Sequence, residues 1–173
     1  MLDYSFTFGG VDIRDEYGLI VERFEDVLAP SLRERKIVVP ERDGAYDYGA
    51  KYYDERRLIV HCASVGMTRA ECRELALALS EKDELIRWDE TDKYYYGRIY
   101  DPTSIQRIAG AAKRFELVFI CDPFVYGDQV TETFTNYDNL TYAGSARTPP
   151  RITITNNNAY SVNGITITMR EAI

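Results

Sequence analysis

The sequence predicts a mainly β protein of the α+β class, in which a β-barrel or sandwich carries one packed α-helix and an extended loop or hairpin arm. Short apolar runs with strand-like composition recur along the chain and are separated by polar turns, as is typical of barrels and sandwiches. A single stretch has the apolar spacing of an amphipathic helix. The 173 residues, 45% hydrophobic and 28% charged, suffice for one folded domain with a small appendage.

The N-terminal residues predict a β-hairpin. Residues 4–8 alternate in polarity, Gly9-Gly10 suits a two-residue turn, and residues 11–13 form the returning strand. Further strands are expected at residues 17–21, 35–39, 56–63, 84–88, 94–100, 104–109, 112–121, 129–135, 152–155 and 164–168.

The predicted helix covers residues 68–81. Thr68 and Glu71 have the spacing of a capping box, in which each side chain accepts a hydrogen bond from a backbone amide at the helix start. Apolar residues then recur three and four positions apart, so one face of the helix is expected to pack on the sheet. This face consists of Cys72, Leu75, Ala76 and Leu79.

Composition divides the chain into three parts. Residues 1–135 contain the helix and most predicted strands, and form the expected β domain. Residues 136–150 are polar, contain Gly and Pro, and are interpreted as a linker. Residues 151–173 hold only two predicted strands, which are marginally stable alone in water. This last segment therefore adds to the first domain, pairs with another chain, or begins a second β domain.

The charge distribution argues against nucleic acid and membrane partners. The net charge is -7, and no cationic stripe is present to contact phosphates, so we expect no sequence-specific nucleic acid binding. The N-terminus has no basic segment followed by an apolar one, and no apolar run approaches the roughly 18 residues of a membrane span. We therefore expect no membrane insertion, and a protein that stays in the cytoplasm where it is made.

Cysteine and histidine are not expected to act in chemistry. The three cysteines, Cys62, Cys72 and Cys121, form no C-x-x-C pair and lie in apolar segments, which predicts small buried thiols. His61 precedes Cys62 in a predicted strand, where adjacent side chains point to opposite faces. The two are therefore not a nucleophile and its base.

Sequence motifs of enzymes and cofactor sites are missing. There is no G-x-S-x-G, Walker loop, G-x-G-x-x-G or H-E-x-x-H motif, so we expect no catalytic residues, no cofactor and no enzyme activity. A calcium loop beginning at Asp89 fails because Tyr94 and Tyr100 occupy the positions that require Gly and Glu. The many paired carboxylates are interpreted as solvated surface.

A long insert separates two apolar runs, residues 37–39 and 58–60. It is rich in tyrosine, which is unusually abundant in the whole chain: fourteen Tyr against seven Phe and one Trp. Tyrosine suits surfaces that are partly buried and partly wet, such as subunit interfaces. Asp43-Gly44 would supply a turn within the insert.

Several short segments, taken in order, carry a family resemblance. They are FGGVD at residues 8–12, YGL at 17–19, PERDGAY at 40–46, YY at 52–53, RLIV at 57–60, WD at 88–89, YYYGRI at 94–99 and FELVFICDP at 115–123. With the single helix between them, they resemble the N-terminal domain of the distal tail proteins of long-tailed, non-contractile bacteriophages or prophages. The resemblance covers about residues 1–135.

The resemblance implies a structural role in the virion tail. Such proteins form a closed ring, typically a hexamer, at the distal end of the tail tube and connect it to the baseplate or host-recognition apparatus. The implied partners are further copies of the chain, the tail tube protein, the tape measure protein and a tail-associated or receptor-binding protein. Assembly would take place in the cytoplasm of the bacterial host. Longer members continue into a galectin-like β-sandwich, and residues 151–173 look like its first strands.

A ring of identical subunits needs one surface that contacts a different surface on the next subunit. We therefore predict that residues 39–57 form an arm that reaches the adjacent subunit; the alternative is a disordered or self-packed surface loop. Two other functions stay open: a carbohydrate-binding module for host cell-surface glycan, and a peptidoglycan or glycoside hydrolase. The candidate interface residues are Arg42, Asp43, Gly44, Tyr46, Tyr48, Tyr52, Tyr53, Arg56 and Arg57.

Overall fold

The computed structural model describes residues 4–49, 51–100, 105–107, 112–133 and 141–168. The chain separates into two compact units, residues 1–133 and residues 134–173. Within the described residues no helix is long and apolar enough to span a membrane.

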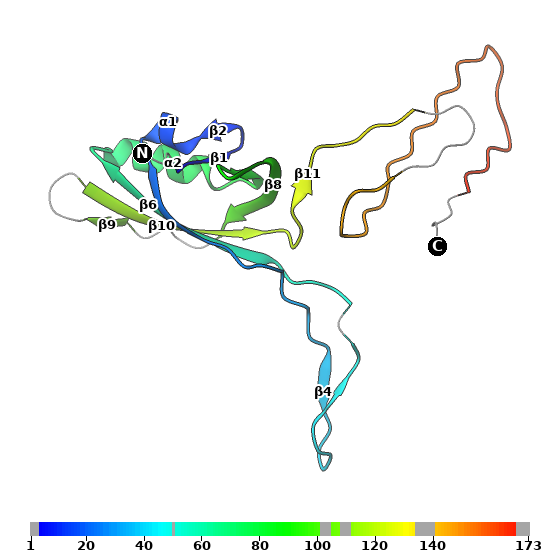
Figure 1. Ribbon diagram of the computed structural model, residues 1–173, viewed down its shortest axis with the longest axis horizontal. Coiled ribbons are helices and arrows are strands. Elements are labelled where there is room, and N and C mark those ends of the chain that lie inside the picture. The colour runs from blue at the N-terminus through cyan, green and yellow to red at the C-terminus, as the bar shows by residue number, and fades with distance from the viewer. Residues whose placement is uncertain (1–3, 50, 101–104, 108–111, 134–140, 169–173) are drawn as a thin grey trace. The chain divides into compact units, whose positions relative to one another are not determined.

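The first unit is built on one antiparallel sheet, so the prediction of a mainly β fold is confirmed. Its strands follow the order β2-β1-β7-β8-β10-β6-β3, with β9 paired to β10 and β11 paired to β8 (Figure 1). The bounds are β1 Phe6–Phe8, β2 Val11–Asp12, β3 Ile20–Glu25, β6 Arg56–Val65, β7 Asp83–Arg87, β8 Glu90–Ile99, β9 Ile105–Arg107, β10 Ala112–Cys121 and β11 Tyr126–Gly127.

A separate pair of strands lies between β3 and β6. β4 (Lys36–Val38) and β5 (Ala45–Asp47) form a two-stranded antiparallel hairpin that extends away from the sheet (Figure 1). Sequence patterns predicted β4 but not β5, because β5 is only three residues long and lies in a segment rich in Gly, Asp and Tyr.

The predicted helix is present as α2 (Arg69–Ala78), and its capping box is confirmed. The Thr68 amide donates to Glu71 Oε2 at 2.5 Å, and the Glu71 amide donates to Thr68 Oγ1 at 3.3 Å. Leu75 and Leu79 are buried, but Ala76 is exposed and Cys72 is only half buried. The buried stripe is therefore narrower than the predicted one, and Ala76 was wrongly assigned to it.

A further short helix that the sequence did not predict, α1 (Ile13–Tyr17), follows β2 directly. The Asp12 carboxylate accepts hydrogen bonds from the amides of Arg14 and Asp15 at 2.9 and 3.2 Å, which satisfies amides that the first helical turn leaves unpaired. Gly18 ends the helix in the left-handed conformation, at φ 62°. Residues 17–21 therefore do not form one strand, and β3 begins at Ile20.

The core lies within the first unit, between the sheet and α2. Alternate residues of β6 and of the second half of β10 are buried, which is the pattern of strands with one face toward the core. Phe119 is fully buried, and its ring centroid lies 5.8 Å from that of Phe6 and 5.5 Å from that of Phe8. Seventeen apolar residues from Phe6 to Cys121 form one buried cluster.

Other strand predictions differ from the structure. β8 begins at Glu90, so the turn before it is shorter than the predicted connection of residues 89–92. Residues 129–133 form no strand, and the rest of that predicted strand, residues 134–135, lies outside the described residues.

The predicted strands at residues 152–155 and 164–168 are not formed either. Ile152, Ile154, Ile165 and Ile167 have the alternation of strands but remain half exposed, at 47–54%. Alternation forms a strand only where a neighbouring strand can take up its hydrogen bonds.

Candidate subunit interface on the extended hairpin

The hairpin is longer than the insert that the sequence marked out. Backbone pairing continues from β4 and β5 toward the sheet. The Tyr48 amide donates to the Arg35 carbonyl at 2.9 Å, the Arg33 amide to Tyr52 at 2.7 Å, and the Asp54 amide to Ser31 at 2.8 Å. We call residues 27–55 the arm. The predicted range 39–57 differs from the arm at both ends, because residues 31–38 pair within the arm and residues 56–57 belong to β6.

The tip of the arm is a loop from Val39 to Gly44. Glu41 and Gly44 both adopt positive φ, at 65° and 76°, which reverses the chain between the strands. Gly44 suits this conformation because it has no Cβ. The predicted turn at Asp43-Gly44 therefore lies at the end of the loop, where β5 begins.

The arm has two chemically different faces. Ile37 pairs with Tyr46, whereas Lys36 pairs with Asp47, and successive side chains of a strand point to opposite sides. The Tyr46 and Tyr48 rings lie 4.8 Å apart and belong to the same side as Ile37. We call Ile37, Tyr46 and Tyr48 the aromatic face of the arm. The opposite side carries the pairs Lys36–Asp47 and Val38–Ala45.

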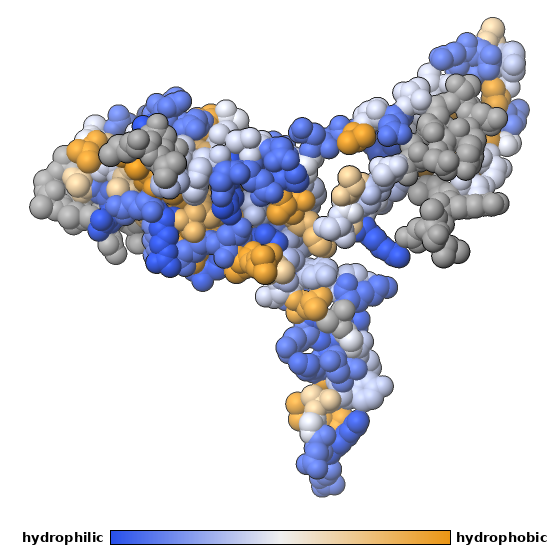
Figure 2. All heavy atoms as spheres, viewed as in Figure 1, coloured by the Kyte–Doolittle hydropathy of each residue, from blue (hydrophilic) through white to orange (hydrophobic). Residues whose placement is uncertain are grey.

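The aromatic face is open to solvent. Ile37, Tyr46 and Tyr48 are 53%, 48% and 60% exposed. Apolar atoms are visible at the surface of the hairpin in Figure 2. A two-stranded hairpin of this size is marginally stable in water, and one apolar face without a partner adds to that cost.

Two of the arginines on the arm have local contacts. The Arg42 guanidinium lies 5.6 Å from the Tyr46 ring centroid, and Arg33 Nε lies 2.7 Å from Asp54 Oδ1. Such exposed pairs contribute little to stability.

The structure separates the nine predicted interface residues into two groups. Arg42, Asp43 and Gly44 are at the tip, and Tyr46, Tyr48, Tyr52 and Tyr53 follow along the arm. Arg56 and Arg57 are instead the first residues of β6, and Arg56 is only 7% exposed.

Arg56, a predicted interface residue, is therefore buried at the start of β6. Sequence reasoning missed Ile37, which pairs with Tyr46 across the hairpin.

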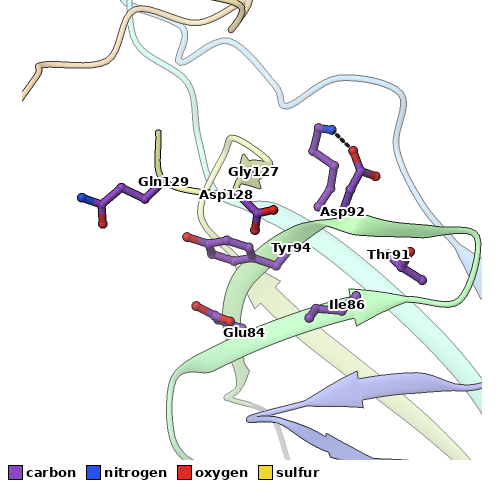
Figure 3. A pocket seen from close by; sticks show the side chains of 9 residues that line it. Glu84, Ile86, Thr91, Asp92, Tyr94, Gly127, Asp128 and Gln129 are labelled. Carbon is purple, nitrogen blue, oxygen red and sulfur yellow. Dashed lines mark hydrogen bonds and ion pairs between the residues drawn. The ribbon is translucent and has the colours of Figure 1, made fainter. Parts of the chain in front are cut away.

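A shallow pocket lies on the β7–β8 hairpin beside β11. It encloses about 330 Å³ and is shown in Figure 3, where Tyr94 lies between Glu84 and Asp128. The Lys93 ammonium contacts Asp92 at 2.6 Å, which raises the pKa of the lysine and lowers that of the aspartate. The lining residues are Glu84, Ile86, Thr91, Asp92, Lys93, Tyr94, Gly127, Asp128 and Gln129.

Potentially reactive side chains lie in structural positions. Burial raises the pKa of the Cys62 and Cys121 thiols to about 12, which keeps both protonated at neutral pH. His61 lies on the opposite face of β6 from Cys62, with Nε2 2.9 Å from Glu25 Oε1. In the part of the chain that the structure describes, no group of three His, Cys, Asp or Glu side chains could hold a metal ion.

Comparison with known protein families identifies the family to which the chain belongs. The family described as the phage tail protein RIFT-related domain matches residues 15–121, which include the arm, α2 and the strands from β3 to β10. The chain belongs to this family of phage tail proteins. The match confirms the resemblance seen in the sequence.

A solved structure of another phage protein has a similar fold. It is the Dit protein (gp 19.1) of phage SPP1, described as a paradigm of the hub adsorption apparatus in phages that infect Gram-positive bacteria. The alignment has a TM-score of 0.59 and 24% sequence identity, and covers 73% of this chain and 53% of the SPP1 protein. This phage tail protein thus spans about half the length of its structural relative. No curated protein matches the sequence.

Proposed function

We propose that this phage tail protein is a non-enzymatic structural component of the distal tail hub, where copies of it form a closed ring, typically a hexamer. The arm of each subunit contacts the next subunit. The ring connects the tail tube to the baseplate or host-recognition apparatus, and its further partners are the tail tube protein, the tape measure and a tail-associated or receptor-binding protein. It assembles in the bacterial host cytoplasm and becomes part of the virion tail.

The observation that carries the proposal is the exposed aromatic face of the arm. Interfaces are enriched in tyrosine and depleted in lysine and aspartate. Tyr46 and Tyr48 of this hairpin lie on the aromatic face, and the Lys36–Asp47 pair lies on the other. An arm that meets a different surface on its neighbour makes a head-to-tail contact, and such contacts close into rings. The likeness to a hub protein of another phage supports the same role.

A face-specific pair of double variants tests the proposal. Ile37→Thr with Tyr46→Thr removes the cross-strand pair of the aromatic face while keeping residues that favour strands. The matched control, Lys36→Thr with Asp47→Thr, changes the cross-strand pair on the opposite face of the same two strands. Light scattering over a concentration series measures the mass, and circular dichroism checks that each variant is folded.

We expect the unchanged protein and the control to form one discrete assembly of several subunits, and the aromatic-face variant to stay monomeric. Assembly of the aromatic-face variant at the same concentrations as the control would overturn the role of the arm. A monomer of the unchanged protein at every concentration would overturn ring formation by this chain alone.

A further inference from the structure

A cluster of polar side chains lies where the arm leaves the sheet. β3 ends at Glu25 and β6 begins at Arg56, so Asp26 and Arg56 are the residues at which the two chain segments of the arm meet the body. Asp26 Oδ2 accepts hydrogen bonds from Arg87 Nη1 at 2.9 Å and from the Tyr95 hydroxyl at 3.1 Å. Its Oδ1 lies 3.7 Å from Arg56 Nη1.

These side chains come from four different strands or their ends, and they are shielded from solvent. The side chains of Arg56, Arg87 and Asp26 are 8%, 18% and 25% exposed. Ion pairs in such surroundings are screened less than surface pairs, and removal of one partner leaves a buried charge uncompensated. The cluster is therefore a fixed joint rather than a surface contact.

Neighbouring groups orient the two arginines toward Asp26. Arg87 donates from Nε and Nη2 to the two oxygens of Asp89 at 2.8 and 2.6 Å, which leaves Nη1 for Asp26. This bidentate pair raises the pKa of Arg87 and lowers that of Asp89. The Arg56 guanidinium lies over the Tyr95 ring, 5.4 Å from its centroid. Each guanidinium is thus also held by a group other than Asp26.

The arm also contacts the body at a second place. Beyond its two connecting chain segments, the described contacts include the Tyr53 ring against Phe124, with centroids 5.3 Å apart. A hairpin joined only by two flexible strands would pivot at its base. Such freedom is lost when the arm docks, and its loss weakens binding.

We propose that Asp26 is a positioning residue, which fixes the direction in which the arm leaves the sheet and so lowers the cost of docking the arm on a neighbouring copy. The second half of this proposal rests on the proposed function; the first half does not. Asp26 reaches both segments of the arm through Arg56 and ties them to β7 and β8 through Arg87 and Tyr95.

The motion of the arm in the monomer tests the first half of the proposal, that Asp26 fixes the direction in which the arm leaves the sheet. A dye attached through Asp43→Cys at the tip reports nanosecond motion by anisotropy decay, with Cys72→Ser removing the partly exposed thiol. The measurement uses the full chain carrying Ile37→Thr and Tyr46→Thr, at a dilution where light scattering gives a monomer. We expect Asp26→Asn to increase the amplitude of tip motion.

The matched control is Glu25→Gln, which neutralises the carboxylate one position before Asp26. Glu25 pairs with Arg23 and His61 and not with the cluster around Asp26. It should leave the tip motion unchanged. If Asp26→Asn fails to fold, Tyr95→Phe removes only the hydroxyl that donates to Asp26 and should produce a smaller increase. Unchanged tip motion in a folded joint variant overturns the positioning role, whether or not the protein assembles.

Assembly tests the second half. In the chain with its aromatic face intact, Asp26→Asn should raise the concentration at which the assembly forms by roughly tenfold, as expected for the loss of charge-assisted hydrogen bonds. Glu25→Gln should not. A mobile tip with unchanged assembly would overturn the link between arm direction and docking. If the unchanged protein does not assemble, the ring proposal fails while the tip measurement still decides the role of Asp26.

Discussion

Single residues of the central sheet show how little spare space the core contains. Gly97 pairs with Cys121 across β8 and β10, and a Cβ at Gly97 would lie 2.4 Å from the Cys121 sulfur and 2.8 Å from the Ile120 carbonyl oxygen. Glycine is therefore required here by the close approach of two strands. Cys121 fills the space that glycine leaves, which explains why its thiol is fully shielded.

The buried thiols predict a loss of stability at alkaline pH. The pKa of Cys62 and Cys121 is about 12 in the folded protein, against an ordinary value of 9.0. Above about pH 9 the unfolded chain ionises these thiols while the folded protein keeps them protonated, so the free energy of unfolding should fall as pH rises. Urea unfolding between about pH 8 and about pH 11 measures this slope.

Cys62→Ala should reduce the slope, and Cys72→Ser, at the half-buried cysteine, serves as the control and should change it less. Equal slopes in the unchanged protein and the Cys62→Ala variant would contradict the assignment to burial of the thiol.

At the scale of elements, local side chains decide where both helices begin. Asp12 caps α1 and Thr68 caps α2, each by accepting from backbone amides of the first turn. The cap at Thr68 was predictable because a long apolar pattern follows it. The cap at Asp12 was not, since α1 has only five residues and buries only Ile13.

Removal of the Thr68 cap should destabilise the protein measurably. Thr68→Ala leaves the Glu71 amide without its acceptor, and we expect the free energy of unfolding to fall by about 1 kcal/mol. Glu71→Gln retains a side chain that can complete the capping box and should cost less. Urea unfolding at neutral pH compares the three proteins; an unchanged midpoint for Thr68→Ala would show that the cap does not contribute.

At the scale of the whole molecule, the first unit contains all the buried apolar side chains of the core cluster, from Phe6 to Cys121. We therefore expect a chain of residues 1–133 to fold with the same thermal midpoint as the full chain, within about 2 °C. Circular dichroism melts compare the two. A clearly lower midpoint would show that residues 134–173 stabilise the first unit.

Prediction from the sequence succeeded where local pattern and tertiary packing agree. β10 was predicted with both ends correct, because its alternation continues over ten residues that all pair with β6. Prediction failed where the surroundings of a residue depend on partners far away in the sequence. Ile37 joins the aromatic face only through pairing with Tyr46, and Arg56 is buried only because Asp26 and Tyr95 converge on it.

The sequence by itself determined the mainly β class, the capped helix, the burial of Cys62 and Cys121 and the tyrosine-rich character of the arm, since each depends on residues close together in the chain. Only the tertiary structure decided the length of the arm, which of its faces is apolar, and the joint at Asp26. These depend on strand register and on contacts between residues up to 69 positions apart. Because a shift of one residue moves every side chain of a strand to the other face, register must be seen in the folded chain.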